Sequence, residues 1–425
     1  MMLLPLLTQA QTLEECQQAA EKNYPLIRQY DLISKTTELT VSNMAKGWLP
    51  QISAYAQATL QSDVTAWPDK MQTMMQQTGI ELKGLKKDQY RIGIDIQQTV
   101  FDGGAIKYAK ETARQKGIVE ATQTEVTLYG IRKRVNEMYF ALLLLNEHLR
   151  LNDDLNSLLQ GNEKKLEAMV KRGTAAESDW QSMKAERLNV AQQRINLASQ
   201  QQMLKTMLSA FCGIEVTTPV KPVKAISAMK PTEETATLST AFGQRPELRA
   251  IDAQLRLADA QERTLNAGLM PRLSVFAQGF YGYPGYNMFE DMMHHRWSWN
   301  GMVGARLTWN IGALYTRHND RSKIQQQRSM AETNREVFLF NNRLEEIQEN
   351  ETINRYRQLM TDDEEIISLR SEVRKAAESK LQHGIIDVND LVKEINNENA
   401  AKVQQSLHEI EMLKAVCELK YITNN

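Results

Sequence analysis

The sequence is poor in the residues that interrupt helices. Among 425 residues there are only 10 prolines and 20 glycines, while hydrophobic residues make up 42% of the chain and charged residues 24%. This composition favours an elongated, largely helical protein over two or three compact domains of ordinary size.

An excess of charge of either sign is also missing. Lysine and arginine together number 51, aspartate and glutamate 52, and the formal net charge is -1. Proteins that bind nucleic acid usually show a basic excess or a basic stripe. We therefore expect no nucleic-acid partner.

Cysteine is scarce. Cys16, Cys212 and Cys417 are far apart in the sequence and form no Cys-x-x-Cys pair. Three cysteines are too few for a disulfide framework. We predict that they are small, mostly buried hydrophobic side chains.

Long apolar runs are absent too. The longest candidate, 138–145, is far shorter than the roughly 18 residues that a membrane-spanning helix needs. The apolar residues 1–10 end in the small residue Ala10 and resemble the end of a secretory signal peptide, although the basic start of such a signal is missing. We assign 1–10 as a signal-peptide remnant. The alternative is an apolar N-terminus on a cytosolic protein.

Common enzyme motifs are missing as well. The sequence contains no G-x-x-x-x-G-K-[ST], no H-E-x-x-H and no G-x-S-x-G. We therefore expect a protein that is not an enzyme, without catalytic residues, cofactor or metal. One cluster of methionine and histidine could bind a soft metal ion. The simpler alternative is that it lies on a loop surface and packs at the rim of the barrel that is predicted below. The cluster consists of Met288, Met292, Met293, His294 and His295.

What the sequence does contain is an internal repeat. The segment 48–57 is matched by 269–278, and Pro50 and Pro271 are 221 residues apart. Further on, 92–96 is matched by 303–307, and Gly173 is matched by Gly384, 211 residues later. We infer two copies of one unit, at 11–222 and 223–425.

Each copy contains a predicted β-hairpin, at about 50–100 and about 271–312. Apolar and polar residues alternate there over roughly ten residues, which fits membrane barrel strands, although one side of a soluble sheet would look the same. We expect Asp95 and Arg306 to face a barrel lumen, and Ile94 and Leu307 to face lipid. The apolar side also includes Ile52, Ala54, Leu60, Ile92, Ile96, Val303, Ala305, Trp309 and Ile311.

The remaining sequence predicts long helices. The segments 105–172 and 313–383 contain no proline, and at 1.5 Å per residue each would be about 100 Å long. Apolar residues recur at three-to-four spacing, as in a coiled coil. Gly173 and Gly384 end these helices, and helices at 177–212 and 387–422 run back, so each copy forms an antiparallel pair.

These elements together predict an assembly. Four strands cannot close a membrane barrel, because an open edge leaves backbone groups unpaired in lipid and single-chain barrels begin at about eight strands. Several chains must therefore share one barrel. Helices of about 100 Å exceed the thickness of a bilayer and must project into water, which after a secretory signal is the periplasm.

A set of short motifs occurs in a characteristic order in this chain. They are Asn23-Tyr24-Pro25-Leu26, Trp48-Leu49-Pro50, Phe101-Asp102-Gly103-Gly104, and the turns at Gly173 and Gly384, each with an aspartate six residues on. With the duplicated unit they make the whole chain resemble the TolC-like outer-membrane efflux family. The resemblance implies a homotrimer in the outer membrane of a Gram-negative bacterium, with a twelve-stranded β-barrel and a helical barrel in the periplasm. It further implies docking to a periplasmic adaptor protein and an inner-membrane pump.

The chain departs from this family pattern at three places. Gly312-Ala313-Leu314-Tyr315 stands where a second Phe-Asp-Gly-Gly is expected, so we predict a different junction between strand and helix there. Ile386 stands where the family usually has a basic residue, and Lys393 where relatives can carry another aspartate. We therefore expect the periplasmic entrance to be held closed more weakly, or differently.

Asp179 and Asp390 are the candidate constriction residues. They lie at equivalent positions just after the turns at Gly173 and Gly384, so three subunits would bring six carboxylates around one opening. A ring of carboxylates selects cations and binds divalent ones, and the family resemblance points to Asp390 in particular. The alternative is helix capping, because Thr174 with Glu177, and Asp387 with Asp390, have capping-box spacing.

The function implied is export of small molecules such as drugs and toxic compounds. A channel for protein export (type I secretion) stays open, because one outer-membrane tunnel can serve several inner-membrane machines. A coiled-coil structural tether is the alternative of another class. It would explain the helices, but not two hairpins of matched polarity.

Overall fold

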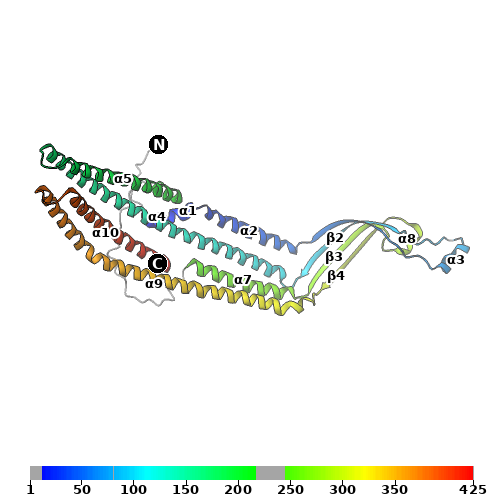
Figure 1. Cartoon of the computed structure of the whole chain (residues 1–425). Helices are drawn as coiled ribbons and strands as arrows, with labels where there is room; N and C mark the ends of the chain where they lie inside the picture. The colour runs from blue at the N-terminus through cyan, green and yellow to red at the C-terminus, as the bar shows by residue number, and fades with distance from the viewer. Residues whose placement is uncertain (1–11, 80, 217–244, 425) are drawn as a thin grey trace, which may run out of the picture. The chain divides into compact units, whose positions relative to one another are not determined.

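The computed structural model describes residues 12–79, 81–216 and 245–424 (Figure 1). The predicted signal-peptide remnant, 1–10, and the start of the second copy, 223–244, lie outside the described residues. The chain divides into two units. Unit 1 comprises the described residues of Met1–Tyr30, Ala121–Ile251 and Thr333–Asn425, and unit 2 comprises those of Asp31–Glu120 and Asp252–Glu332.

Two long helices run through both units. They are α4 (Ala105–Lys171), with 67 residues, and α9 (Ala313–Gln382), with 70. Within unit 1 each is followed by a returning helix of 36 residues, α5 (Glu177–Cys212) or α10 (Val388–Thr423). Each of these four helices begins and ends within one residue of its predicted position. No helix among the described residues is long and apolar enough to span a membrane.

Helix α1 (Leu13–Asn23) completes the core of unit 1. A capping box begins it: the Thr12 hydroxyl accepts from the Glu15 N–H at 3.2 Å, and the Glu15 carboxylate accepts from the Thr12 N–H at 2.9 Å. Three-to-four spacing places its apolar residues on one face, which is buried against α4 and α5. This core includes Leu13, Cys16, Ala20, Val135, Tyr139, Leu208 and Cys212.

Arg245 closes the C-terminal end of α10 in the same unit. Its guanidinium donates to the carbonyls of Tyr421 and Ile422 at 2.9 and 3.1 Å and pairs with Glu247 at 2.7 Å. Three aromatic rings surround it, and the side chain is only 5% exposed. A buried cation is tolerated here because it meets the negative end of the helix dipole, pairs with Glu247 and donates hydrogen bonds to backbone carbonyls.

Unit 2 is built on one antiparallel sheet with the strand order β1-β2-β3-β4. The strands are β1 (Gln51–Leu60), β2 (Asp88–Phe101), β3 (Arg272–Tyr283) and β4 (Ser298–Thr308). Each predicted hairpin is present, and β2 pairs with β3 to join the two. Among the described residues, the outer edges of β1 and β4 have no partner strand.

The predicted end of β4 was wrong. The strand stops at Thr308, so Trp309 and Ile311 are not part of it. The Trp309 indole N–H donates to the Leu269 carbonyl at 3.0 Å, and the chain then turns into α9. Since β3 begins at Arg272, β4 has no further strand residues to pair with beyond Thr308.

The strand register separates the two faces of the sheet as the alternation predicted. Asp95 lies opposite Ser53 and Gln278, and Arg306 lies opposite Ser274, so these polar residues share one face. Ile94 and Leu307 lie on the other face, where they are 50% and 68% exposed. Exposed apolar residues on that face also include Ile52, Ile92, Ile96, Val275 and Val303.

On the polar face, aromatic rings lie over glycines. A Cβ at Gly93 would approach the Tyr55 ring to 3.0 Å, and one at Gly304 would approach the Phe276 ring to 2.8 Å. The guanidinium of Arg91 lies over Phe280 at 5.1 Å, and that of Arg306 over Phe276 at 4.9 Å. Glycines on this face therefore make room for rings, and the rings of β3 also contact arginines on β2 and β4.

Candidate channel constriction

The turns that end α4 and α9 have the same geometry. Gly173 and Gly384 have φ values of 74° and 70°, in the left-handed region that glycine enters without steric cost. Each turn has the two hydrogen bonds of a Schellman motif. They run from Gly173 to Val170, Thr174 to Met169, Gly384 to Leu381 and Ile385 to Lys380. Both turns lie at the same end of unit 1 (Figure 1).

The capping-box spacing corresponds to a side-chain cap in one copy and not in the other. The Asp387 carboxylate caps α10 by accepting from the Asp390 N–H at 2.9 Å. In the first copy the N-cap is Ala176, which has no side-chain oxygen, and the Thr174 hydroxyl donates to the Met169 carbonyl instead. Within the described part of the chain, neither the Asp179 nor the Asp390 carboxylate caps its helix.

The structure places the two candidate carboxylates in the first turns of α5 and α10. Asp390 is exposed and Asp179 is half-exposed. Ile386, in the place of the family's basic residue, packs against the apolar core beneath the turns, and Lys393 is exposed. That core includes Leu159, Leu166, Met183, Val388, Leu391 and Ile395. The carboxylates therefore lie on a rigid, apolar base.

Two ion pairs below the turns were not predicted from the sequence. Glu163 pairs with Arg187 between α4 and α5, and Arg374 pairs with Glu398 between α9 and α10. At the 211-residue offset the four positions coincide, with the charges exchanged. The repeat could have revealed the pairs, because each acid and base are 24 residues apart in both copies.

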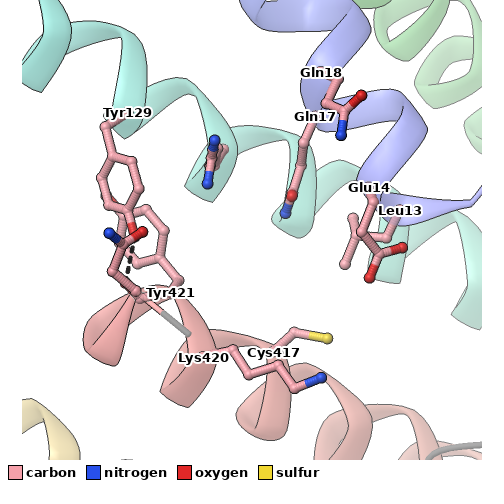
Figure 2. A pocket seen from close by; sticks show the side chains of 10 residues that line it. Leu13, Glu14, Gln17, Gln18, Tyr129, Cys417, Lys420 and Tyr421 are labelled. Atoms are coloured by element: carbon pink, nitrogen blue, oxygen red, sulfur yellow. Dashed lines mark hydrogen bonds between the residues drawn. The ribbon is translucent and has the colours of Figure 1, made fainter. Parts of the chain in front are cut away.

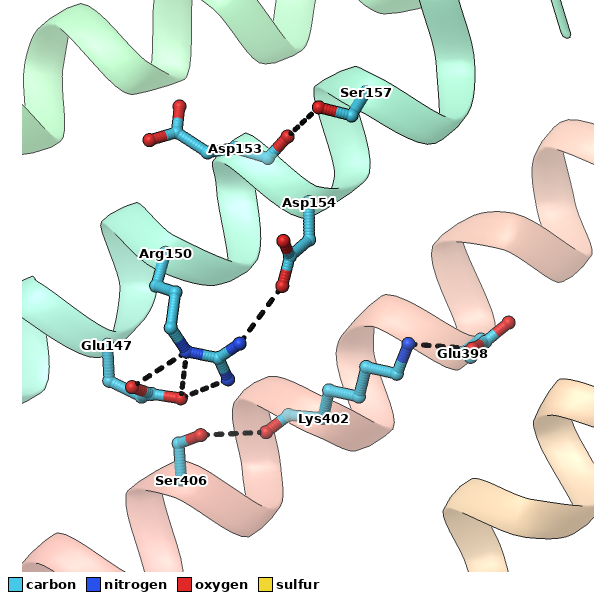
Figure 3. A network of polar contacts seen from close by, with 8 residues as sticks. All are labelled: Glu147, Arg150, Asp153, Asp154, Ser157, Glu398, Lys402 and Ser406. Carbon is cyan, nitrogen blue, oxygen red and sulfur yellow. Dashed lines mark hydrogen bonds and ion pairs between the residues drawn. The ribbon is translucent and has the colours of Figure 1, made fainter. Parts of the chain in front are cut away.

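Glu398 is the centre of the second pair and is buried. Lys402 also contacts it, at 2.7 Å, as Figure 3 shows. Burial alone would raise the pKa of Glu398, but the hydrogen bonds from Lys402 and Arg374 outweigh burial and lower this pKa. Nearby on α4, Arg150 joins Glu147 and Asp154 in an exposed network (Figure 3). Buried pairs resist separation more than exposed ones, so Arg374 and Glu398 hold α9 to α10.

The junction between β2 and α4 depends on Asp102. Its buried carboxylate accepts from the N–H groups of Gly104 and Ile106 at 2.8 and 2.7 Å. Gly103 and Gly104 have φ values of 66° and 88°. A carboxylate at the start of a helix satisfies free N–H groups and meets the positive end of the dipole.

The predicted departure in the second copy was wrong by three residues. Trp309-Asn310-Ile311-Gly312, not Gly312-Ala313-Leu314-Tyr315, stands in the place of Phe101-Asp102-Gly103-Gly104, because α9 begins at Ala313 as α4 begins at Ala105. The Ala313 N–H bonds to the Asn310 carbonyl at 3.3 Å, as that of Ala105 bonds to Asp102 at 3.2 Å. The extra three residues of α9 restore the 211-residue offset at the turns.

We expect Asp102→Ala to lower the free energy of unfolding by about 1 to 2 kcal/mol, because two partly buried N–H groups lose their acceptor. Denaturant titration followed by the helical circular-dichroism signal measures the change. Asn310→Ala is the matched control, since the bond at the second junction uses the backbone carbonyl, which the substitution keeps. Equal losses in both variants would contradict the capping role of Asp102.

Two members of the methionine and histidine cluster, Met292 and His295, contact the first hairpin loop, whereas Met288, Met293 and His294 are exposed. Met292, in α8 (Met288–His294), is buried with Leu85 and Tyr283. The His295 ring nitrogen lies 2.7 Å from the Gly84 carbonyl oxygen. Within the described residues, no group of three or more His, Cys, Asp or Glu could hold a metal ion.

A small hollow in unit 1 is lined by α1, α4 and α10 (Figure 2). Its volume is about 240 Å³, and it is open on one side. The Tyr129 hydroxyl donates to the Tyr421 carbonyl at 2.6 Å, and Cys417 lies in the wall. The hollow is separate from the turns that hold Asp179 and Asp390.

Comparison with known proteins gives likeness of structure only. No family model and no curated protein matches the sequence. A structure of CusC is 12% identical, with a TM-score of 0.70, and covers 97% of this chain and 91% of that one. The outer membrane protein VceC of Vibrio cholerae is 12% identical, with a TM-score of 0.66 and coverages of 97% and 96%. The MtrE outer membrane channel of Neisseria gonorrhoeae, in its open state, is 12% identical, with a TM-score of 0.67 and coverages of 97% and 89%.

The chain has the fold of the TolC-like outer-membrane channels, and the resemblance inferred from its motifs is confirmed at the level of fold. The predicted fold class is confirmed as mainly α, with four antiparallel strands and long helices. The twelve-stranded barrel of three subunits stays a prediction, because one chain supplies four strands.

Proposed function

We propose that the protein is one subunit of a channel in the outer membrane of a Gram-negative bacterium, extending into the periplasm and exporting small molecules. The observation that carries the proposal is the sheet of unit 2. One of its faces is apolar and exposed, and within the described residues both of its outer edges lack a partner strand. A barrel completed by other copies and surrounded by lipid satisfies both features. No step of this function requires catalysis.

A second observation supports a homotrimer. Helix α9 presents exposed apolar residues at three-to-four spacing. Helix α5 presents Leu188 and Ile195, which are two helical turns apart and therefore lie on the same side of the helix. Apolar stripes on long helices are normally covered by a neighbouring helix. The α9 residues are Val337, Phe340, Leu344 and Ile347. A tether made of coiled coils alone would not explain why one face of the sheet is apolar and exposed.

The working partners follow from the proposed class. A channel supplies no energy for export. We therefore propose that an inner-membrane pump supplies it and, together with a periplasmic adaptor protein, delivers the cargo to the helical end. At that end Asp179 and Asp390, supplied by three subunits, form the proposed constriction. The support is their equivalent placement after two Schellman turns of the same geometry.

The assembly test is a mass measurement in detergent. We expect a particle of three chains, each of 48.6 kDa, that becomes monomeric only on denaturation, because four strands per chain cannot close. Mass photometry, or light scattering corrected for detergent, provides the value. A folded monomer that stays soluble without detergent would overturn the barrel, and with it the proposed channel.

A further inference from the structure

Two cysteines that are far apart in the sequence meet in the core of unit 1. Cys16 lies on the buried face of α1, and Cys212 is the last residue of α5. The Cys212 thiol donates to the Cys16 carbonyl at 3.4 Å, and the side chains are 1% and 2% exposed. The expectation of three unrelated hydrophobic side chains misses this proximity.

Neighbouring contacts hold the two helices in this position. The Asn23 amide donates to the carbonyls of Ala210 and Phe211, both at 3.1 Å, and the Tyr24 ring stacks on Phe211 at 6.2 Å. Gly213, with φ of 67°, lies against Asn23 so closely that a Cβ would come within 2.5 Å of that side chain. Because α1 cannot slide along α5, the thiols stay adjacent.

Burial makes both sulfur atoms inaccessible to solvent once the core has closed, since the two side chains are 1% and 2% exposed. The hydrogen bond between the two thiols and burial raise the pKa of Cys16, while the same hydrogen bond lowers the pKa of Cys212, so Cys212 is the thiol of the pair that ionises first. The thiolate is the nucleophile in disulfide exchange. Any oxidation of this pair must therefore occur while α1 is docking, before the core excludes solvent.

We propose that Cys16 and Cys212 form a disulfide that ties α1 to the end of α5. The inference rests on the proposed location, because disulfides form in the periplasm and not in the reducing cytosol. Each bond releases two protons and two electrons from the thiols. A disulfide oxidant of the compartment, such as an oxidised dithiol protein, accepts them and leaves as two thiols.

Cys417 stays a free thiol in this arrangement. It belongs to the rim of the same core but lies in the wall of the hollow, where Figure 2 shows its sulfur. It is half-buried, whereas the other two cysteines are fully buried. The odd cysteine therefore provides an internal reference for counting thiols.

The first experiment uses the chain isolated from cells whose thiols are alkylated at the moment of lysis. After proteolysis without reductant, mass spectrometry should find one peptide pair joined through Cys16 and Cys212, and an alkylated Cys417. Cell fractionation in the same samples locates the protein independently. Three alkylated cysteines on a protein found in the outer membrane would overturn the disulfide proposal without contradicting the proposed channel function.

The second experiment does not depend on location. Reduced, unfolded chain is refolded in detergent with reduced and oxidised glutathione, and the pairing is mapped again. The control Cys417→Ser should keep the bond, while Cys16→Ser and Cys212→Ser should lose it and unfold at a temperature lower by about 5 °C or more. Refolded wild-type chain without the Cys16–Cys212 bond, or with Cys417 in its place, would overturn the inference.

Discussion

Ile94→Arg should remove most of the assembled trimer from the outer membrane. Ile94 lies in the middle of β2 on the exposed apolar face, and a charge on the lipid face of a barrel costs about 2 to 4 kcal/mol near the midplane. Every subunit carries the substitution, so the cost recurs three times per barrel. The measurement is the amount of heat-dissociable trimer in membrane extracts relative to wild type.

Two controls separate the lipid face from the act of substitution. Ser53→Arg places the same side chain on the polar face, directly opposite Asp95, and should assemble normally because the two charges pair. Asp95→Asn removes a charge from that face and should also assemble. If Ile94→Arg gives as much heat-dissociable trimer as these two variants, the assignment of faces is reversed or no barrel exists.

Asp390→Ala should relieve the block of channel current by divalent cations. In planar bilayers we expect wild-type current to be blocked from the periplasmic side at concentrations on the order of millimolar, as for weak carboxylate sites. Removing three carboxylates from the ring should raise the half-blocking concentration at least about tenfold, which is about 1.4 kcal/mol. The trimer should remain intact, because Asp390 is exposed and caps no helix within the described residues.

Asp387→Asn is the matched control for this experiment. It removes a charge three residues away and keeps an oxygen that can cap α10, so the block should change little. The double variant with Asp179→Ala tests whether the first copy contributes to the ring. An unchanged block in both Asp390→Ala and the double variant would place the constriction elsewhere on the helices.

Local periodicity explains which features could be predicted. The alternation around Ile94 and Asp95 has a period of two, and the register of the sheet keeps it. Gly173 and Gly384 end their helices because the turn needs a positive φ, a property of the residue itself. Such signals lie within a few residues, so the long helices were placed close to their observed ends, whereas the end of β4 was placed too late.

Features that depend on a shifted offset were missed. The junction at Asn310 repeats that at Asp102, but α9 is longer by three residues, and a constant offset of 211 hides the match. The predicted capping pair of Thr174 and Glu177 is also absent, for a different reason. The spacing was suitable, but the Thr174 hydroxyl bonds back to Met169 within the turn.

The sequence by itself determined the class of architecture: paired long helices, two amphipathic hairpins and turns at fixed glycines. It did so because each signal is a local period or a backbone requirement. Only the tertiary structure decided which distant residues meet. Arg245 reaches the end of α10, Arg374 pairs with Glu398, and Cys16 meets Cys212 because helices far apart in the chain pack side by side. No local pattern encodes such contacts, since they depend on the relative rotation and register of the packed helices.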